Sequence, residues 1–263
     1  LGAALAEVWQ THPSVMRATS EVEAAGFDIK SAQTGYYPFL SITAVGATNE
    51  DSNSTVSLVQ PLWSGGKTTA EVKEAESAQA QALASLSQVR LNLGLELAES
   101  YLSVLQAREQ EALWLQYIKS LENLLAVITR RADNGVSPQV DIQTAQTRLS
   151  QARAGYALNR SFHLRSKLHL EALLHRPVGA LNWPQDSNRL TEAELDAILG
   201  EDLASIHPGG QQSLAEIAIQ EARVKAAKAS LFPSLSLQHS AQISQSSGDF
   251  TPDESTQLVL QYQ

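Results

Sequence analysis

The chain has 263 residues, a formal net charge of −9 at pH 7 and no cysteine. The acidic balance argues against nucleic acid as a partner, because the protein's own field repels phosphate. The lack of cysteine excludes disulfide frameworks, thiolate zinc sites and cysteine nucleophiles. No run approaches the roughly 18 apolar residues of a transmembrane helix, although membrane β-strands are short and would not produce such a run.

The first elements are predicted to be a helix and two strands. A helical pattern begins at Leu1, passes His12-Pro13 and reaches Ser31-Ala32. Apolar and polar residues then alternate over 40–44 and 55–58, on either side of a polar loop. This alternation predicts two β-strands within 36–63.

A very long helix is predicted next. Between Gly66 and Gly135 lie 68 residues without proline and with one glycine. A straight helix of that length spans roughly 100 Å and needs a partner along its length. Two apolar lines predict contacts on both flanks, as in a closed ring of helices. The first line is Leu86, Val89, Leu93, Leu97, Tyr101 and Val104, and the second is Leu91, Leu95, Leu102 and Leu105.

The segment from Asn134 to Pro138 predicts a tight turn between two helices. Gly135 suits a left-handed residue after the first helix. Ser137 is expected to cap the second helix, with Pro138 in its first turn. The second helix should run to about Arg176. Its apolar positions follow steps of three and four with small residues between, which predicts close helix packing: Ile142, Ala145, Leu149, Ala152 and Tyr156.

The stretch 177–204 is rich in proline and glycine and predicts a side element, with one short acidic helix over Leu190–Leu203. Beyond it the chain repeats itself. His12-Pro13 recurs as His207-Pro208 at an offset of 195 residues, and Tyr37-Pro38 recurs as Phe232-Pro233 at the same offset.

The repeat predicts a second helix followed by two more strands within 231–263. Their apolar and polar residues alternate over runs of about 9–11 residues, the span of a tilted barrel strand. Alternation alone fits an amphipathic hairpin on a soluble core equally well. Four strands cannot cover so long a helix, which favours a membrane sheet. The repeat would place a second helical hairpin after Gln263, so we expect either that the sequence is truncated there or that the second copy lacks its hairpin.

These features together resemble the TolC-family outer-membrane channel proteins, the outer-membrane factors of Gram-negative tripartite efflux and type I secretion systems. Order, spacing and duplication make the resemblance specific, although each motif alone is loose. The motifs are His12-Pro13 with Tyr37-Pro38-Phe39-Leu40, then Gln60-Pro61-Leu62-Trp63-Ser64-Gly65-Gly66-Lys67, and finally Arg131-Ala132-Asp133-Asn134-Gly135-Val136-Ser137-Pro138-Gln139-Val140-Asp141.

The resemblance implies a mainly α fold with β: a long α-helical coiled-coil barrel plus an antiparallel transmembrane β-barrel shared by a homotrimer. Segments 1–35, 64–176 and 205–230 would form the periplasmic tube. Segments 36–63 and 231–263 would supply the strands, and 177–204 an equatorial segment. The protein would lie in the bacterial outer membrane, in contact with its lipid, and extend into the periplasm.

The implied function is an exit duct for secreted proteins or small-molecule efflux substrates. Its partners would be a periplasmic adaptor (membrane fusion) protein and an inner-membrane transporter. The alternative is a soluble periplasmic coiled-coil adaptor or structural protein. An adaptor would have its β-unit split around the hairpin, whereas here strand pairs precede each hairpin position.

The resemblance assigns adaptor docking to the turn formed by Asn134, Gly135, Val136 and Ser137, and a gating contact to Asp141. Good capping would explain the turn residues equally well, and the helix dipole would explain Asp141.

No enzyme, cofactor or metal site is predicted. The Ser64–Thr68 stretch resembles the end of a phosphate-binding loop, but Pro61 stands where that motif needs glycine. Three histidines, His163, His169 and His175, recur every six residues and therefore do not share a helix face.

Overall fold

The computed structural model describes residues 2–46, 52–179, 181–182, 206–246 and 249–262. The chain divides into two compact units, one formed by Leu1–Met16 and Val89–Glu192 and the other by Arg17–Gln88 and Ala193–Gln263. The predicted helix over Leu190–Leu203 lies outside the described residues, as does most of the predicted side element.

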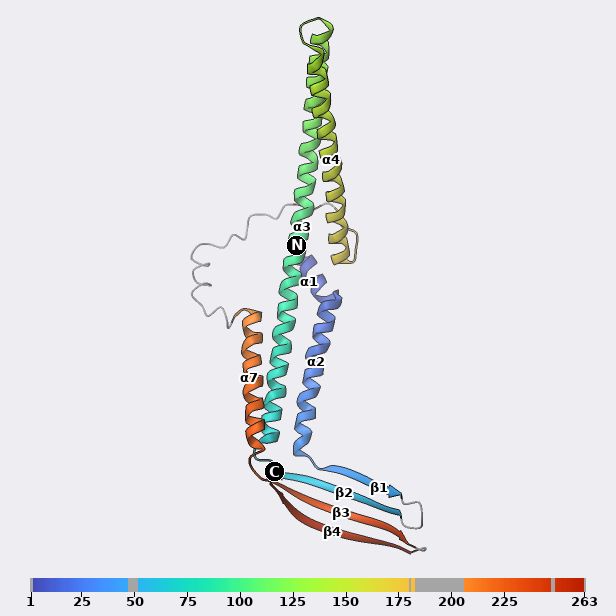
Figure 1. Cartoon of the computed structure of the whole chain (residues 1–263), viewed down its shortest axis with the longest axis vertical. Coiled ribbons are helices and arrows are strands. Elements are labelled where there is room, and N and C mark those ends of the chain that lie inside the picture. Colours follow the sequence, from blue (N-terminus) through green and yellow to red (C-terminus); the bar gives the residue numbers. More distant parts are fainter. Residues whose placement is uncertain (1, 47–51, 180, 183–205, 247–248, 263) are drawn as a thin grey trace. The chain divides into compact units, whose positions relative to one another are not determined.

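Helices dominate the chain (Figure 1). The helix α3 is a single element of 67 residues, which confirms the prediction of one uninterrupted long helix, and it contributes to both units. The helical elements are α1 (Gly2–Thr11), α2 (Pro13–Gln33), the 3-10 turn η1 (Thr34–Tyr36), α3 (Lys67–Asp133), α4 (Gln139–Leu174) and α7 (Pro208–Ala229).

In the first unit, α4 runs back along the second part of α3, and α1 packs beside them (Figure 1). The indole N–H of Trp9 donates to the carbonyl oxygen of Arg90 at 3.0 Å, which ties α1 to α3. Arg176, just beyond α4, forms an ion pair with Glu7 at 3.1 Å. The most deeply buried large side chains of this unit are Val8, Leu97, Leu105 and Leu170.

In the second unit, α2 and α7 lie along the first part of α3 (Figure 1). Their buried positions are mostly small residues, so that the helix backbones can approach closely. These small residues recur at intervals of seven along α2, α3 and α7. The buried sets are Ala18 and Ala25, then Ala70, Ser77 and Ala84, then Ala215, Ala222 and Ala229.

The second unit also holds one antiparallel sheet in the order β1-β2-β3-β4. The four strands lie within the two segments predicted from alternation. Strands β1 and β2 form one hairpin and β3 and β4 another, and β2 pairs antiparallel with β3 although the two are far apart in the sequence. The strands are β1 (Phe39–Gly46), β2 (Ser52–Trp63), β3 (Ser234–Ser246) and β4 (Asp249–Gln261).

The register gives the sheet two chemically different faces. Ile42 pairs with Val56 and Leu237 pairs with Leu258, so apolar side chains fall on one face. Ser240 lies between Ser57 and Ser255, in rows of serine, threonine and glutamine on the other face. We name these the apolar face and the polar face. The apolar face comprises Leu40, Ile42, Val56, Leu58, Leu237, Ala241, Leu258 and Leu260, with His239 among them.

Candidate functional site: the helical hairpin and its tip

Small residues hold the α3–α4 hairpin together. Leu149 and Ala152 of α4 are buried against Leu121 of α3, which confirms the predicted close packing. Opposite Gly155, the six-membered ring of Trp114 comes so close that a Cβ on Gly155 would lie 2.6 Å from it. The two helices can meet at this level only because position 155 lacks a side chain.

Polar contacts also bridge the hairpin. Glu111 accepts hydrogen bonds through its two carboxylate oxygens, from Tyr156 at 3.2 Å and from His163 at 2.7 Å. The buried Asn159 donates to the carbonyl oxygen of Ala107 at 3.1 Å. These contacts fix how α4 aligns along α3 and thereby where the tip stands.

The tip is a tight helix end of the Schellman type. The Gly135 N–H donates to the carbonyl oxygen of Ala132 at 2.9 Å, and the Val136 N–H donates to that of Arg131 at 2.8 Å. Gly135 has φ 72°, so the predicted left-handed glycine is confirmed. The side-chain amide of Asn134 donates to another terminal carbonyl of α3.

The predicted cap of α4 by Ser137 is wrong. The N-cap is Pro138, whose backbone is extended, and no side chain caps the helix. The carbonyl oxygen of Pro138 accepts from the Asp141 N–H at 3.1 Å, and α4 begins at Gln139. Proline fixes φ near the value needed to enter the helix, which makes a serine cap unnecessary.

Val136 is an apolar residue of the tip and is 74% exposed. In a Schellman turn this position commonly packs on a residue one turn earlier in the helix. Here that residue is Arg131, which offers no apolar cover. Val140, at the start of α4, is also exposed. The tip therefore presents apolar surface that the chain itself does not cover.

Asp141 lies in the first turn of α4 and is exposed. No ion pair reaches it from any residue that the structure describes. Arg130 and Arg131 occupy the last turn of α3, where positive charge is favourable. The structure therefore places Asp141 beside the tip residues, without an oppositely charged partner in the part of the chain that it describes.

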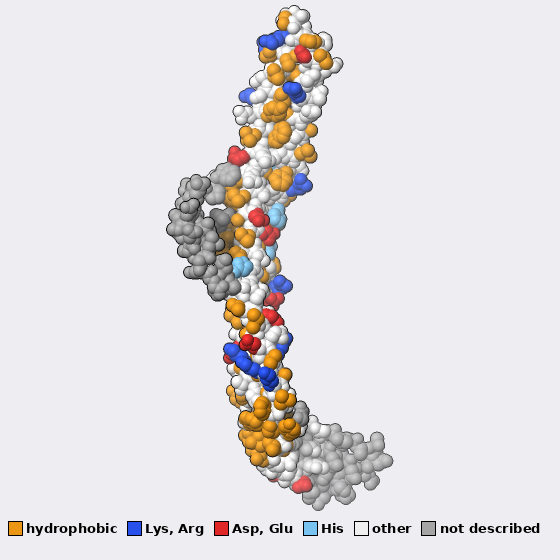
Figure 2. Space-filling view, turned by 60° about the vertical axis from the view of Figure 1, so that its left-hand side comes forward, with side chains coloured by type: hydrophobic (Ala, Val, Ile, Leu, Met, Phe, Trp, Pro, Cys, Tyr) orange, Lys and Arg blue, Asp and Glu red, His pale blue; other side chains and the backbone are white. Residues whose placement is uncertain are grey.

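The two predicted apolar lines of α3 differ in burial. Leu93, Leu97 and Val104 of the first line are buried, as a packing stripe requires. In the second line Leu105 is fully buried, whereas Leu91, Leu95 and Leu102 are exposed. Figure 2 shows hydrophobic side chains continuing along the exposed surface of the helices. Further exposed examples on the hairpin are Leu113, Leu124, Leu158, Phe162 and Leu164.

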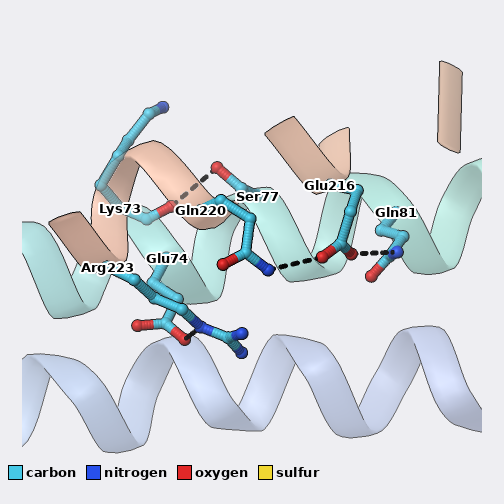
Figure 3. A network of polar contacts seen from close by, with 7 residues as sticks. All are labelled: Lys73, Glu74, Ser77, Gln81, Glu216, Gln220 and Arg223. Atoms are coloured by element: carbon cyan, nitrogen blue, oxygen red, sulfur yellow. Dashed lines mark hydrogen bonds and ion pairs between the residues drawn. The ribbon is translucent and has the colours of Figure 1, made fainter. Parts of the chain in front are cut away.

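A polar network that the sequence analysis missed joins α7 to α3 (Figure 3). Arg223 donates to Glu74 at 2.7 Å, and Gln81 donates to Glu216 at 2.8 Å. Gln220, one turn along α7, donates to the other oxygen of Glu216 at 2.7 Å. The two cross-helix pairs are separated from each other by seven residues along both helices. A search of the sequence for polar residues repeated every seven positions could have found them.

The network changes the proton affinity of its charged members. Hydrogen bonds from Gln220 and then Gln81 lower the pKa of Glu216 below its ordinary value, because they favour the carboxylate. The hydrogen bond from Arg223 to Glu74 raises the pKa of the Arg223 guanidinium.

The strand-to-helix joint at Ser64–Thr68 is a structural turn. The Ser64 hydroxyl accepts from the Thr68 N–H at 3.3 Å, which caps α3. Gly65 has φ 63°, and a Cβ there would lie 2.9 Å from the carbonyl oxygen of Ala229. The positive φ and the close carbonyl oxygen both require glycine at position 65 for structural reasons, without any role in binding phosphate.

The histidines have separate surroundings. His163 contacts Glu111, His169 lies 3.7 Å from Glu96, and the His175 ring packs edge-on against His12. Among the described residues no group of three potential metal ligands comes together. In the same part of the chain, none of the helices combines the length and the apolar character needed to cross a membrane.

Comparison with known proteins identifies the family. The sequence profile of the outer membrane efflux protein family matches residues 4–175. The chain belongs to this family. Membership confirms the resemblance to outer-membrane channels, assigns the chain to the outer membrane and agrees with the prediction that it is not an enzyme.

A curated relative is the pyoverdine export outer membrane protein OpmQ of Pseudomonas aeruginosa, 29% identical over 179 residues. The match covers 67% of this chain and 37% of OpmQ, so the chain spans little more than a third of that relative.

Two solved structures share the fold. The outer-membrane channel OprN superposes with a TM-score of 0.81 at 17% identity, over 99% of this chain and 63% of OprN. CusC, described as forming a transmembrane channel, also gives 0.81 at 17% identity, over 100% of this chain and 65% of CusC. These likenesses confirm the predicted combination of long helices with an antiparallel sheet.

Proposed function

We propose that the chain is part of one subunit of a homotrimeric exit duct that carries cargo across the periplasm and the outer membrane. The main support is the sheet, whose apolar face carries large side chains that the described chain leaves exposed, among them Ile42, Leu58 and Leu258. Its outer strands β1 and β4 each have one free edge among the described residues. Three copies joined edge to edge would supply twelve strands, with apolar faces toward lipid and polar faces toward an aqueous pore.

In this proposal segments 1–35, 64–176 and 205–230 form the periplasmic tube. Segments 36–63 and 231–263 form the barrel strands, and 177–204 the equatorial segment. The exposed leucines of α3 and α4 support the tube, because neighbouring subunits would bury them. Family membership favours this duct over a soluble periplasmic adaptor.

We place the contact with a periplasmic adaptor at Asn134, Gly135, Val136 and Ser137, and the adaptor would link the duct to an inner-membrane transporter. The exposed Val136 supports this assignment. Asp141, one helical turn further, is proposed as a gating residue whose partner another helix would supply. The export of pyoverdine by OpmQ, as its name states, favours a small molecule over a secreted protein as cargo.

The orientation of the sheet can be tested with two neighbouring residues of β4. Gln257 lies on the polar face and Leu258 on the apolar face, and both are exposed in the chain. These 263 residues contain no cysteine, so Gln257→Cys and Leu258→Cys each introduce a single thiol here, and any cysteine in the rest of the full-length protein is replaced by serine. In the full-length protein in outer membranes, a charged maleimide should label the first thiol, and only a lipid-soluble maleimide should label the second. Equal labelling by the charged reagent would contradict the duct.

The tip assignment is tested by Val136→Arg. We expect export to be lost while trimer formation and membrane insertion persist, because the change lies on an exposed turn. Val136→Ile keeps the apolar surface and should export normally. If Val136→Arg exports as well as the parent, the adaptor docks elsewhere.

The gating role of Asp141 is tested separately with Asp141→Asn. This variant should raise single-channel conductance in planar bilayers, and unchanged conductance would contradict a gating role for Asp141.

A further inference from the structure

His12 forms the junction between α1 and α2. Its backbone N–H donates to the carbonyl oxygen of Val8 at 2.9 Å, and its own carbonyl oxygen accepts from the Met16 N–H at 3.2 Å. The side chain caps α2, because the Ser14 N–H donates to Nδ1 of the imidazole at 3.3 Å. The Ser14 hydroxyl lies 2.7 Å from the same nitrogen. A backbone N–H can only donate, so this cap requires an imidazole without a hydrogen on Nδ1.

The second copy of the internal repeat carries the same kind of cap. His207 precedes α7 as His12 precedes α2, and its Nδ1 accepts from the Gly209 N–H at 3.0 Å. Serine, threonine, asparagine and aspartate are the usual helix caps, and none of them changes its hydrogen bonding near neutral pH. Both helices therefore begin with a cap that protonation of an imidazole would remove.

The ring of His12 also contacts the end of α4. His175 is the C-cap of α4, and its imidazole lies edge-on to that of His12 with the ring centroids 6.0 Å apart. Its backbone is left-handed, with φ 52°, and among the described residues it is the only non-glycine residue with a positive φ. Glycine would adopt this conformation without strain. The strained backbone thus places a second imidazole against the cap of α2, and strain of this kind often accompanies function.

The carboxylates that flank this contact on α1, α2, α3 and α4 already face cations. The pairs are Glu7 with Arg176 at 3.1 Å, Glu21 with Arg17 at 3.9 Å, Glu96 with His169 at 3.7 Å and Glu171 with Lys167 at 3.9 Å. Arg90 of α3, whose carbonyl oxygen accepts from Trp9, adds an exposed positive side chain. Positive charges on His12 and His175 would therefore find no free carboxylate among these groups.

We propose that His12 and His175 form a proton-sensitive latch between the α1–α2 junction and the end of α4. Imidazole ordinarily takes up a proton between pH 5 and 8. A proton on Nδ1 of His12 removes the acceptor of the Ser14 N–H and places positive charge at the N-terminus of α2, where the helix dipole opposes it. A proton on His175 adds repulsion between the two rings.

The latch is closed when both rings are neutral and opens when both are charged, so its contribution to local stability is lost as the pH falls. It is built entirely from contacts inside the first unit. It therefore does not depend on the proposed duct, and a test of the latch leaves the duct untouched.

Hydrogen exchange followed by mass spectrometry tests the latch in the full-length protein in detergent micelles, at about pH 7.5 and about pH 5.5. Labelling times are corrected for the intrinsic effect of pH on amide exchange. In the parent, segments 8–16 and 170–178 should lose protection by about ten-fold at the lower pH, the combined effect of a lost cap and of two charges 6.0 Å apart.

Asparagine at both positions provides the matched variant. Asparagine caps helices well and tolerates the left-handed conformation, but it does not take up a proton. The variant with His12→Asn and His175→Asn should therefore be protected like the parent at the higher pH and should lose no protection at the lower pH. The control carries His169→Asn and His239→Asn, two exposed histidines outside the latch, and should respond to pH as the parent does.

Two results would overturn the proposal: a parent whose protection is the same at both pH values, or a double-asparagine variant that loses as much protection as the parent. The start of α7 separates the cap from the ring contact. There the described residues supply the His207 cap without a second imidazole, so segment 207–212 should lose less protection than 8–16. An equal loss in both segments would show that His175 has no part in the response and would refute the latch as a pair of rings.

Discussion

Gly155→Ala tests whether the hairpin depends on the contact between Gly155 and Trp114. The added Cβ would lie 2.6 Å from Cη2 and 2.9 Å from Cζ2 of the indole, so one helix or the ring must move. Such overpacking costs about 1–3 kcal/mol. Alanine also stabilises a helix by about 1 kcal/mol relative to glycine, because its helix propensity is higher. The expected net loss is therefore about 0–2 kcal/mol, or a few degrees in melting temperature for a chain of this size.

Trp114→Phe provides the matched background for this measurement. Phenylalanine lacks the indole's six-membered ring at that position, so the clash disappears and Gly155→Ala should then stabilise the hairpin by about 1 kcal/mol. Thermal unfolding of the parent, both single variants and the double variant, followed by circular dichroism in detergent, gives the coupling between the two positions. The reasoning is refuted if Gly155→Ala has the same effect in both backgrounds.

Three further variants test the second unit. Gly65→Ala should lower the melting temperature, because its φ of 63° and the carbonyl oxygen of Ala229 at 2.9 Å leave no room for a Cβ. Leu58→Arg should impair insertion, since an arginine at mid-depth on a lipid face costs about 2–4 kcal/mol; insertion into vesicles measures this. Because the pKa of Glu216 is lowered from its ordinary value of 4.5, the carboxylate stabilises the folded chain at pH values above 4.5, and this contribution is lost as the pH falls through the folded-state pKa. The melting temperature of Glu216→Gln should therefore decrease less than that of the parent when the pH is lowered.

Most of the fold could be predicted because long uninterrupted patterns determine it. The glycines at 66 and 135 bound α3 to within a residue or two, and period-two alternation located all four strands. The cap at Ser137 was mispredicted, because a proline with extended backbone can start a helix without any side-chain cap. The spacing of the two apolar lines could not reveal that Leu105 is buried while Leu91 and Leu95 are exposed, because steps of three or four residues do not define how wide the buried face of a helix is.

The site was predictable only in part. The turn around Gly135 follows from local chemistry, whereas its use as a docking surface depends on how much of Val136 the chain covers. The pairing of Trp63 with Leu235 could not be predicted from alternation. A β-bulge between Pro61 and Trp63 shifts the register of β2 against β3 by one residue and thereby changes the face of the sheet on which the residue lies. The contact between Gly155 and Trp114 depends on the alignment of two helices, and only the isolated glycine within α4 hinted at it.

The α3–α7 interface explains how small residues can coexist with a unique alignment. Buried alanines and Ser77, repeated every seven residues, would fit almost as well if α7 slipped by one heptad. The polar pairs remove this degeneracy. A slip in one direction would set Glu74 against Glu216 and Lys67 against Arg223, and a slip in the other would break the Glu74–Arg223 pair at 2.7 Å. Exposed ion pairs contribute little to the free energy of unfolding. A small difference in free energy is nevertheless enough to select one alignment of α7 along α3 when the packing of the alternatives is nearly equal. The selected alignment then places Gly65 of the strand-to-helix joint against Ala229 at the end of α7.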